Sequence, residues 1–348
     1  MSFVPLALVT RGDTVESVHY GAVAVVDRAG QVIASAGDPE RVLYTRSACK
    51  PFQAMPFVAR GGHVRFGLTT EEVAVICASH SGEAVHEAAV RSILKKAGRD
   101  ESDLLCGSHI PHAMRTGEKQ VVGKADLSPV LNNCSGKHAG MLAFCELMGV
   151  SCENYIDFEH PIQREIRTAV SDVTDVPEAQ IEMGIDGCSA PNFALPLSGL
   201  ARAFGRLTRS DDDATYGEAP GIIYDAMTSH PHMVSGTGRG DLAIMETGAG
   251  DWVSKVGGEA IKGIGVRSAG LGIAVKIADG NTRALVPVVV EVLRQLGLLT
   301  RVEGTALADW VRPDVRNHRD IVIGRIEPDF QLTTVASGVL AGGTDYAA

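Results

Sequence analysis

The chain has 348 residues, of which 45% are hydrophobic and 21% charged, and its formal net charge at pH 7 is −10. This length and composition are typical of a soluble globular protein that forms one large domain or two lobes. The negative charge, and the lack of a basic run with interleaved aromatic residues, argue against a nucleic-acid partner.

The N-terminal residues and the cysteines indicate the cellular compartment in which the protein is expected. The first five residues lack a charged segment followed by an apolar one, so no secretory signal is expected. The most apolar run, residues 284–299, contains Pro287, Glu291 and Arg294 and is too short and too charged to span a membrane. The seven cysteines are an odd number. They predict free thiols in a reducing cytoplasm.

The first part of the chain alternates between strand and helix signals. Residues 3–10 and 19–36 are rich in β-branched residues and predict an N-terminal hairpin. A helix is expected to begin near Ser47, with Pro56 kinking or ending it. Thr69 and the glutamate three residues later form a capping box for the next helix.

The rest of the chain ends in further strands. A helix is predicted from Asn192 to Arg206 and a strand from Leu242 to Glu246. Later elements are strands at 252–256, 260–266, 271–277 and 320–326 and a helix at 283–298. Strands at both ends predict an α/β protein of the α+β type. Its central sheet would be mostly antiparallel, made from the N- and C-terminal segments, with helices packed on it and a helical lobe. Residues 1–332 would form a single two-lobed domain, followed by a tail at 333–348.

Ser47 and Lys50 are the first candidates for chemistry. They are three residues apart, so in a helical turn both side chains lie on one face. A neutral lysine can take the proton of a serine hydroxyl and make it a nucleophile. The pattern is short and often occurs by chance at solvated helix starts, so it needs support from elsewhere in the chain.

Two further positions could supply that support. Ser79 stands in a polar turn between apolar helices, and Lys262 stands inside an apolar strand. Burial would lower the pKa of such a lysine and favour a neutral amine. The alternative for Lys262 is an edge strand from which its amine reaches water. The order Ser-x-x-Lys, Ser-x-Ser and lysine strand partly matches penicillin-binding proteins and serine β-lactamases, which have Ser-Asp-Asn and Lys-Thr-Gly at the later positions.

Cysteines form a second constellation. Cys134 and Lys137 are three residues apart at a helix start, and Cys188 lies in a glycine-flanked loop two residues after Asp186. Two thiolates and a nitrogen ligand would suit a zinc ion with one open position. Ordinary core cysteines are the alternative, and Cys49 is expected to serve packing only.

Six motifs together resemble the rhizobial-type, class 3 L-asparaginases, and the resemblance extends to about residue 330. They are Arg46-Ser47-Ala48-Cys49-Lys50-Pro51, Ala78-Ser79-His80-Ser81-Gly82-Glu83, Asn133-Cys134-Ser135-Gly136-Lys137-His138, Asp186-Gly187-Cys188-Ser189-Ala190-Pro191, Gly236-Thr237-Gly238-Arg239 and Lys262-Gly263-Ile264-Gly265. The resemblance implies a fold similar to serine β-lactamases, a homodimer, and hydrolysis of L-asparagine.

The resemblance also implies roles for individual residues. Ser47 with Lys50, and Ser79 with Lys262, would form two Ser–Lys pairs in one catalytic site. Cys134, Lys137 and Cys188 would hold Zn²⁺, whose binding would weaken at low pH because a lysine ligand must be neutral. The substrate-binding residues would be Arg46, Asp186 and His138.

Two other classes of function remain open at this stage. A glutaminase or another β-lactamase-like serine amidase would use the same dyads, although Ser-Asp-Asn and Lys-Thr-Gly are missing at the positions considered. A non-catalytic protein that binds zinc or an amino acid is the second class. Ammonia release from L-asparagine and L-glutamine separates these alternatives.

Overall fold

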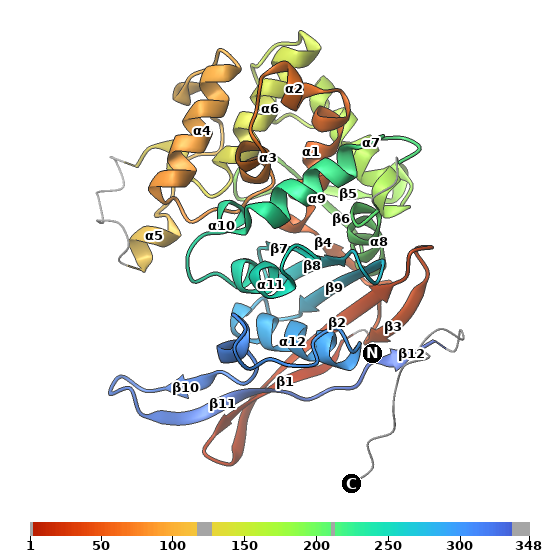
Figure 1. Ribbon diagram of the computed structural model, residues 1–348, viewed down its shortest axis with the longest axis vertical. Helices are drawn as coiled ribbons and strands as arrows, with labels where there is room; N and C mark the ends of the chain where they lie inside the picture. Colours follow the sequence, from red (N-terminus) through yellow and green to blue (C-terminus); the bar gives the residue numbers. More distant parts are fainter. Residues whose placement is uncertain (1–2, 117–126, 210–212, 336–348) are drawn as a thin grey trace.

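The structure is a computed structural model that describes residues 3–116, 127–209 and 213–335. Figure 1 shows a large twisted sheet in the lower half of the molecule and a helical lobe above it. N- and C-terminal segments, drawn in red and blue, lie side by side in the sheet. This is the α+β arrangement that the sequence predicts. Among the described residues, no helix has the length and apolar character needed to cross a membrane.

The large sheet is antiparallel throughout its main path. Its strands run in the order β10-β11-β1-β2-β9-β8-β7, and β3 joins β2 to β12 at the side. Their bounds are β1 Val4–Arg11, β2 Thr14–Val26, β3 Val32–Ala36, β7 Trp252–Gly257, β8 Ile261–Val266, β9 Leu271–Ile277, β10 Asp314–Arg316, β11 Val322–Pro328 and β12 Thr333–Thr334. The pairing of β1 with β11 and of β2 with β9 closes the two chain ends into one sheet.

The alternation of side chains in β2 separates two cores. Ala22, Ala24 and Val26 pack in the cluster shared with the helical lobe. Val23 and Val25 pack in a second cluster with α12, which spans Leu285–Gln295. Successive side chains of a strand point to opposite faces, so one apolar strand serves both cores. Both faces of the sheet centre are therefore covered.

The helix α8, Leu197–Leu207, lies close against the sheet because glycines face it. A Cβ atom at Gly263 would lie 1.9 Å from the ring of Phe204, and one at Gly272 would lie 2.0 Å from the carbonyl oxygen of Ala201. No side chain could occupy these positions without a shift of the helix or sheet. Close packing against Phe204 thus explains why a glycine follows Lys262.

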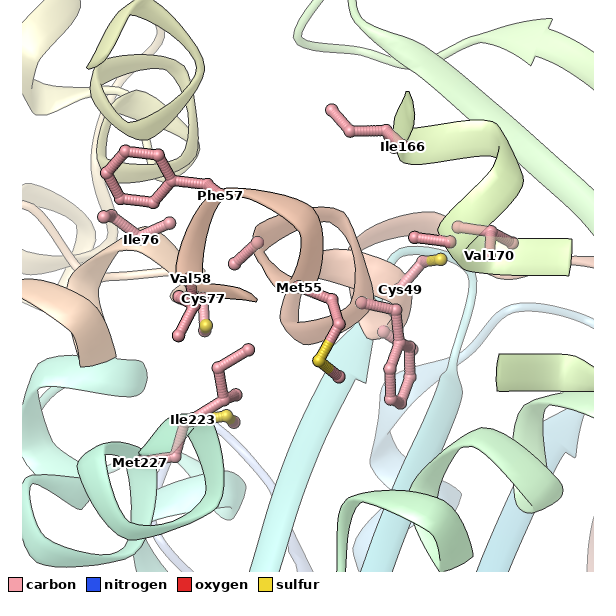
Figure 2. Packing of buried hydrophobic residues seen from close by; sticks show 14 of the residues in the cluster. Cys49, Met55, Phe57, Val58, Ile76, Cys77, Ile166, Val170, Ile223 and Met227 are labelled. Atoms are coloured by element: carbon pink, nitrogen blue, oxygen red, sulfur yellow. The ribbon is translucent and has the colours of Figure 1, made fainter. Parts of the chain in front are cut away.

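The helical lobe surrounds a buried central helix, α1. Its helices are α1 Lys50–Ala59, α2 Gly62–Arg65, α3 Thr70–Ile76, α4 Ala84–Lys96, α5 His112–Arg115, α6 Ser135–Met148, α7 Pro161–Thr174, α9 Ala219–Ser229 and α10 Pro231–Val234. Figure 2 shows Met55, Phe57 and Val58 of α1 packed among residues of α3, α7 and α9. Cys49, just before α1, is buried in the same cluster and serves packing, as predicted.

Three local predictions are wrong at least in part. Pro56 does not end α1, which continues to Ala59 and packs on α7 and α9. The helix predicted from Asn192 begins only at Leu197 as α8, because Pro191–Pro196 form strand β6 of a small sheet with β4, Val42–Tyr44, and β5, Glu182–Ile185. The predicted strand at 242–246 lies within helix α11, Gly240–Gly248. Segments 191–196 and 242–246 are short apolar runs, and hydrophobic periodicity alone does not tell a strand from a helix in such runs. The elements that pack against them decide which secondary structure forms.

The capping box predicted at Thr69 is confirmed. The Glu72 backbone N–H donates to the Thr69 side chain, and the Thr69 N–H donates to the Glu72 carboxylate. The predicted tail begins in β12, which pairs with β3 through Thr333 and Thr334. Residues 336–348 lie outside the described part of the chain.

Candidate active site

Ser79 lies between two buried lysines. It follows α3 in the loop that leads to α4, and its backbone N–H donates to Val234 O at 2.9 Å. Lys50 Nζ lies 3.1 Å and Lys255 Nζ 2.9 Å from Ser79 Oγ. The relative exposures of Ser79, Lys50 and Lys255 are 3%, 1% and 0%. Three segments distant in sequence thus place one hydroxyl and two amines in a water-poor site.

The two lysine amines are held by backbone carbonyls. Lys50 Nζ also donates to Ala78 O and, at 3.3 Å, to Asn133 O. Lys255 Nζ donates to Val256 O at 2.7 Å. Burial lowers the pKa of Lys255 well below its ordinary value, although the charge of Asp241 opposes the change. A neutral amine at Lys255 can accept a proton from Ser79.

Ser47 is more accessible than Ser79 and is half-buried. It lies in the short 3-10 helix Arg46–Cys49 that leads directly into α1. Strand β7 ends against this turn, since a Cβ atom at Gly257 would lie 2.7 Å from Thr45 O. The Ser47 hydroxyl makes no hydrogen bond with the described residues. Ser47 and Lys50 are close along the chain, as predicted, but their side chains are not hydrogen-bonded to each other.

The predicted pairing of Ser79 with Lys262 is wrong in this structure. Lys262 Nζ forms a buried ion pair with Asp241 of α11 and lies 3.3 Å from Ser254 Oγ. In the β7–β8 ladder Lys255 is opposite Gly263, and Lys262 is opposite Val256. Directly opposed residues share a face of the sheet, and consecutive residues do not. Lys255 therefore faces Ser79 and the helical lobe, whereas Lys262 faces α11.

Asp241 is satisfied on both oxygens. Ser254 Oγ donates to Asp241 Oδ1 at 2.7 Å, and the Val256 N–H donates to Oδ2 at 2.8 Å. Burial alone would raise the pKa of Asp241, but the ammonium of Lys262 and these hydrogen bonds hold it well below its usual range. The ion pair links α11 to β8, and the hydrogen bonds from Ser254 and Val256 link α11 to β7 on either side of Lys255.

The sequence analysis did not single out Lys255 or Asp241. The signal for the lysine is present as Lys255-Val256-Gly257, which matches the Lys-Thr-Gly motif of penicillin-binding proteins at two of its three positions. Lys262-Gly263-Ile264 matches it at one position only. Asp241 has no comparable motif, since its role depends on contacts across the fold.

The predicted metal ligands lie together. Lys137 Nζ is 3.0 Å from Cys188 Sγ, and Cys134 Sγ donates to Asn133 Oδ1 at 3.3 Å. The neighbouring Cys134 thiol and, after it, the charge of Lys137 lower the pKa of Cys188 to about 5, although burial opposes the change. Cys188 Sγ is also 3.7 Å from Asp186 Oδ2. Two sulfurs and a nearby carboxylate fit the donor preferences of zinc. Burial lowers the pKa of Lys137, but the charges of Cys188 and Cys134 outweigh it and raise that pKa above its ordinary value. Lys137 therefore has to lose a proton before its nitrogen can bind a metal.

The sequence predicts metal and substrate binding in and around this cluster. No group of three or more His, Cys, Asp or Glu side chains with metal-binding geometry occurs among the described residues, and lysine is not one of these types. Arg46 Nε donates to Asp186 Oδ1 at 2.7 Å. His138 accepts or donates through Nδ1 to Tyr155 at 2.7 Å, and its buried Nε2 has no partner in the described chain. The predicted substrate-binding residues thus surround the thiol cluster.

A cleft of about 480 Å³ borders the serine–lysine site. Its wall includes Asn133 and Val256, whose carbonyl oxygens accept from Lys50 and Lys255. The lining residues are His80, His109, Ile110, His112, Arg115, Asn133, Gly238, Arg239, Gly240, Asp241, Val256, Lys262, Thr282, Leu285, Val286 and Trp310. A small-molecule substrate can be accommodated in this volume.

Comparison with protein families gives a match over residues 7–328 to L-asparaginase II. The chain belongs to the L-asparaginase II family. This confirms the resemblance drawn from the six motifs. Membership of the L-asparaginase II family makes the chain an asparaginase-type hydrolase that acts on a small molecule. The match ends just before the predicted tail.

Similarity beyond the L-asparaginase II family is remote. No curated protein matches the chain. A β-lactamase from Mycobacterium bovis is 15% identical, with 79% of this chain and 94% of that one aligned and a TM-score of 0.40. A proposed β-lactamase from Bacteroides dorei is 13% identical, with 79% and 93% aligned and a TM-score of 0.41.

Proposed function

We propose that this member of the L-asparaginase II family hydrolyses L-asparagine to L-aspartate and ammonia through a serine ester. The observation that carries the proposal is the Ser79 hydroxyl held between Lys50 and Lys255 at 3.1 and 2.9 Å. A buried serine with two amines within hydrogen-bond distance can move protons in both directions, which acyl transfer from an amide requires.

In the first half-reaction the neutral amine of Lys50 removes the proton of Ser47, and Ser47 Oγ attacks the side-chain amide carbon of asparagine. The proton then passes from Lys50 to Ser79 while Ser79 gives its own proton to the amide nitrogen. The carbon–nitrogen bond breaks and ammonia leaves, so the enzyme holds a β-aspartyl ester. Backbone N–H groups, including that of Ser47, would stabilise the oxyanion.

Water completes the reaction. Lys50 removes a proton from the water molecule that attacks the ester carbon, and the carbon–oxygen bond to Ser47 breaks. The proton returns to Ser47 Oγ, which releases L-aspartate and restores the neutral lysine. Lys255 replaces Lys262 in the predicted second Ser–Lys pair. Its neutral amine would hold the Ser79 hydroxyl in the path between Lys50 and the leaving nitrogen, and it would accept the hydroxyl proton transiently and return it.

Cys134, Lys137 and Cys188 would hold Zn²⁺, with Asp186 beside them. When bound, the metal would supply a Lewis acid that helps to orient the α-amino group of the substrate. Arg46 and Asp186 form an ion pair next to this cluster, so Arg46 would act on the substrate by positioning Asp186.

We also propose a cytoplasmic homodimer. All seven cysteines are free thiols, which agrees with a reducing compartment. Light scattering during size-exclusion chromatography measures the oligomeric state. A monomer at all concentrations tested would contradict the dimer.

Ammonia release from L-asparagine and from L-glutamine tests the activity. We expect faster release from L-asparagine. Mass spectrometry of enzyme quenched during turnover tests the covalent step, with an aspartyl adduct expected on Ser47 and absent from Ser47→Ala. An adduct on Ser79 would reverse the two serine roles, and an adduct on neither serine would contradict the covalent mechanism.

A further inference from the structure

Arg239 is a cation of the cleft without a counter-ion. It lines the cleft and precedes helix α11, and its guanidinium makes no hydrogen bond or ion pair with the described residues. By contrast, the guanidinium of Arg46, near the thiol cluster, already binds Asp186 at 2.7 Å. Guanidinium groups taken out of water are normally paired with an anion.

Among the described residues that line the cleft, no carboxylate forms an ion pair with Arg239, although the charge of Asp241 acts on it from a distance. Asp241 is the one carboxylate among the described residues that line the cleft, and it is committed to Lys262, Ser254 and the Val256 N–H. Burial is the main cause that lowers the pKa of His80, Lys255 and Lys262, and the positive charge of Arg239 lowers each of them further. Arg239 thus lies close to the serine–lysine site.

The loop that carries Arg239 is fixed in place. The Thr237 N–H donates to Glu83 Oε1 at 2.9 Å, and Thr237 Oγ1 donates to Oε2 at 3.2 Å. Gly236 has a φ of 109°, and a Cβ atom there would lie 2.5 Å from Ser81 Oγ. Only glycine fits this close approach. Ser81 and Glu83 belong to the segment that starts at Ser79, so Arg239 is held by the same segment as the serine.

We propose that Arg239 binds the α-carboxylate of the amino-acid substrate and thereby selects β-amides that carry this group. The inference rests on the proposed function, because it requires the amide to lie at the serine–lysine site. A planar guanidinium can form two parallel hydrogen bonds to a carboxylate. Arg115 also lines the cleft and makes no hydrogen bond or ion pair with the described residues, but it is exposed to water, whereas Arg239 is half-buried. A bound carboxylate would therefore neutralise a charge that is partly removed from water.

The test compares L-asparagine with β-alaninamide, which is asparagine without its α-carboxylate. Ammonia release is measured for wild type, Arg239→Met, Arg239→Lys and the control Arg325→Met, an exposed surface position on β11. We expect Arg239→Met to lower kcat/KM for L-asparagine on the order of 100-fold, chiefly through KM, and to leave that for β-alaninamide within about threefold. Arg239→Lys should recover part of the loss, since it keeps the charge without the fork.

An equal loss with both substrates in Arg239→Met would overturn the proposal and indicate a structural role. No loss with L-asparagine would overturn it as well. If wild type releases no ammonia from L-asparagine, the proposed function fails, and the thermal shift produced by L-aspartate then decides the inference. A shift in wild type and Arg325→Met that is lost in Arg239→Met would support carboxylate binding, and an unchanged or absent shift would refute it.

Discussion

Lys255 and Lys262 lie on neighbouring strands but on opposite faces of the sheet. Lys255 is paired with Gly263 across the β7–β8 ladder, and its amine is 2.9 Å from Ser79 Oγ. Lys262 is one residue away from Gly263 and forms a buried ion pair with Asp241. One lysine is thus placed for proton transfer and the other for holding α11 on the sheet, and the two can be separated by experiment.

Replacing Lys255 by Met should lower kcat for L-asparagine by about 100-fold or more, because Ser79 loses one of the two amines that hold it. Lys255→Arg should be equally impaired, since a guanidinium stays protonated and cannot accept a proton. Steady-state ammonia release measures both variants. Full activity in Lys255→Arg would show that only charge is needed there. The exposed Lys95→Met serves as control.

Replacing Lys262 by Met should act on stability. It leaves the Asp241 carboxylate buried without its ammonium, which costs about 3 kcal/mol in free energy of unfolding. The double variant Lys262→Met/Asp241→Asn should recover part of this loss, because the amide is neutral and still accepts from Ser254 and Val256. Urea unfolding measures all three proteins. Additive losses in the double variant would contradict the coupling between Lys262 and Asp241.

The buried amine of Lys255 makes stability depend on pH. Its ordinary pKa is 10.5, and burial lowers the pKa in the native protein well below that value. Between the two values the unfolded chain holds one more proton than the native protein, so the free energy of unfolding rises with pH. The slope contributed is at most about 1.4 kcal/mol per pH unit. As pH falls through the native pKa, this gain is fully lost.

Urea titrations of wild type and Lys255→Met from pH 6 to pH 9 isolate this contribution. The difference between the two proteins should grow in favour of wild type as pH rises, because the variant lacks the titrating amine. A difference that is constant across this range would show that the native pKa of Lys255 lies above pH 9, and it would contradict the expected lowering. Ammonia release by wild type should fall at acid pH for the same reason.

If the thiol cluster binds zinc, the binding should require Cys134 and Cys188. We expect zinc bound to purified wild type, measured by elemental analysis, to be lost in Cys134→Ser and Cys188→Ser and kept in Cys145→Ser. Cys145 is a buried thiol of the same helix as Lys137 and is not part of the cluster. Removing the metal with a chelator should raise KM for L-asparagine about tenfold or more. Zinc retained in Cys188→Ser would contradict the ligand set.

The contact between α8 and the sheet should tolerate no side chain at Gly263. An added methyl group would lie 1.9 Å from the Phe204 ring, so Gly263→Ala should cost about 2 kcal/mol and shift β8 and β7. Gly221→Ala is the matched control, because nothing lies within 4 Å of its added methyl group and alanine favours helix α9 by about 0.5–1 kcal/mol. Thermal unfolding compares the two variants. Equal stability would contradict the close packing.

Local patterns in the sequence were sufficient for several features. The capping box at Thr69 needs only residues within one turn, and the alternating apolar residues of β2 define two buried faces. The spacing of Ser47 and Lys50 places them on one helical turn whatever the rest of the fold does. The family motifs added the grouping of Cys134, Lys137 and Cys188, which spacing alone did not supply.

Only the tertiary structure decided which lysine meets Ser79. Lys255 and Ser79 are 176 residues apart, and the contact depends on the register of β7 against β8 and on the packing of α3 above the sheet. The sequence carried both lysines in apolar strands, and either could be buried. A strand sends consecutive side chains to opposite faces, so a change of one position in register exchanges their surroundings. That register is set by cross-strand pairing and by the glycines under α8, which lie far from Ser79 in the chain.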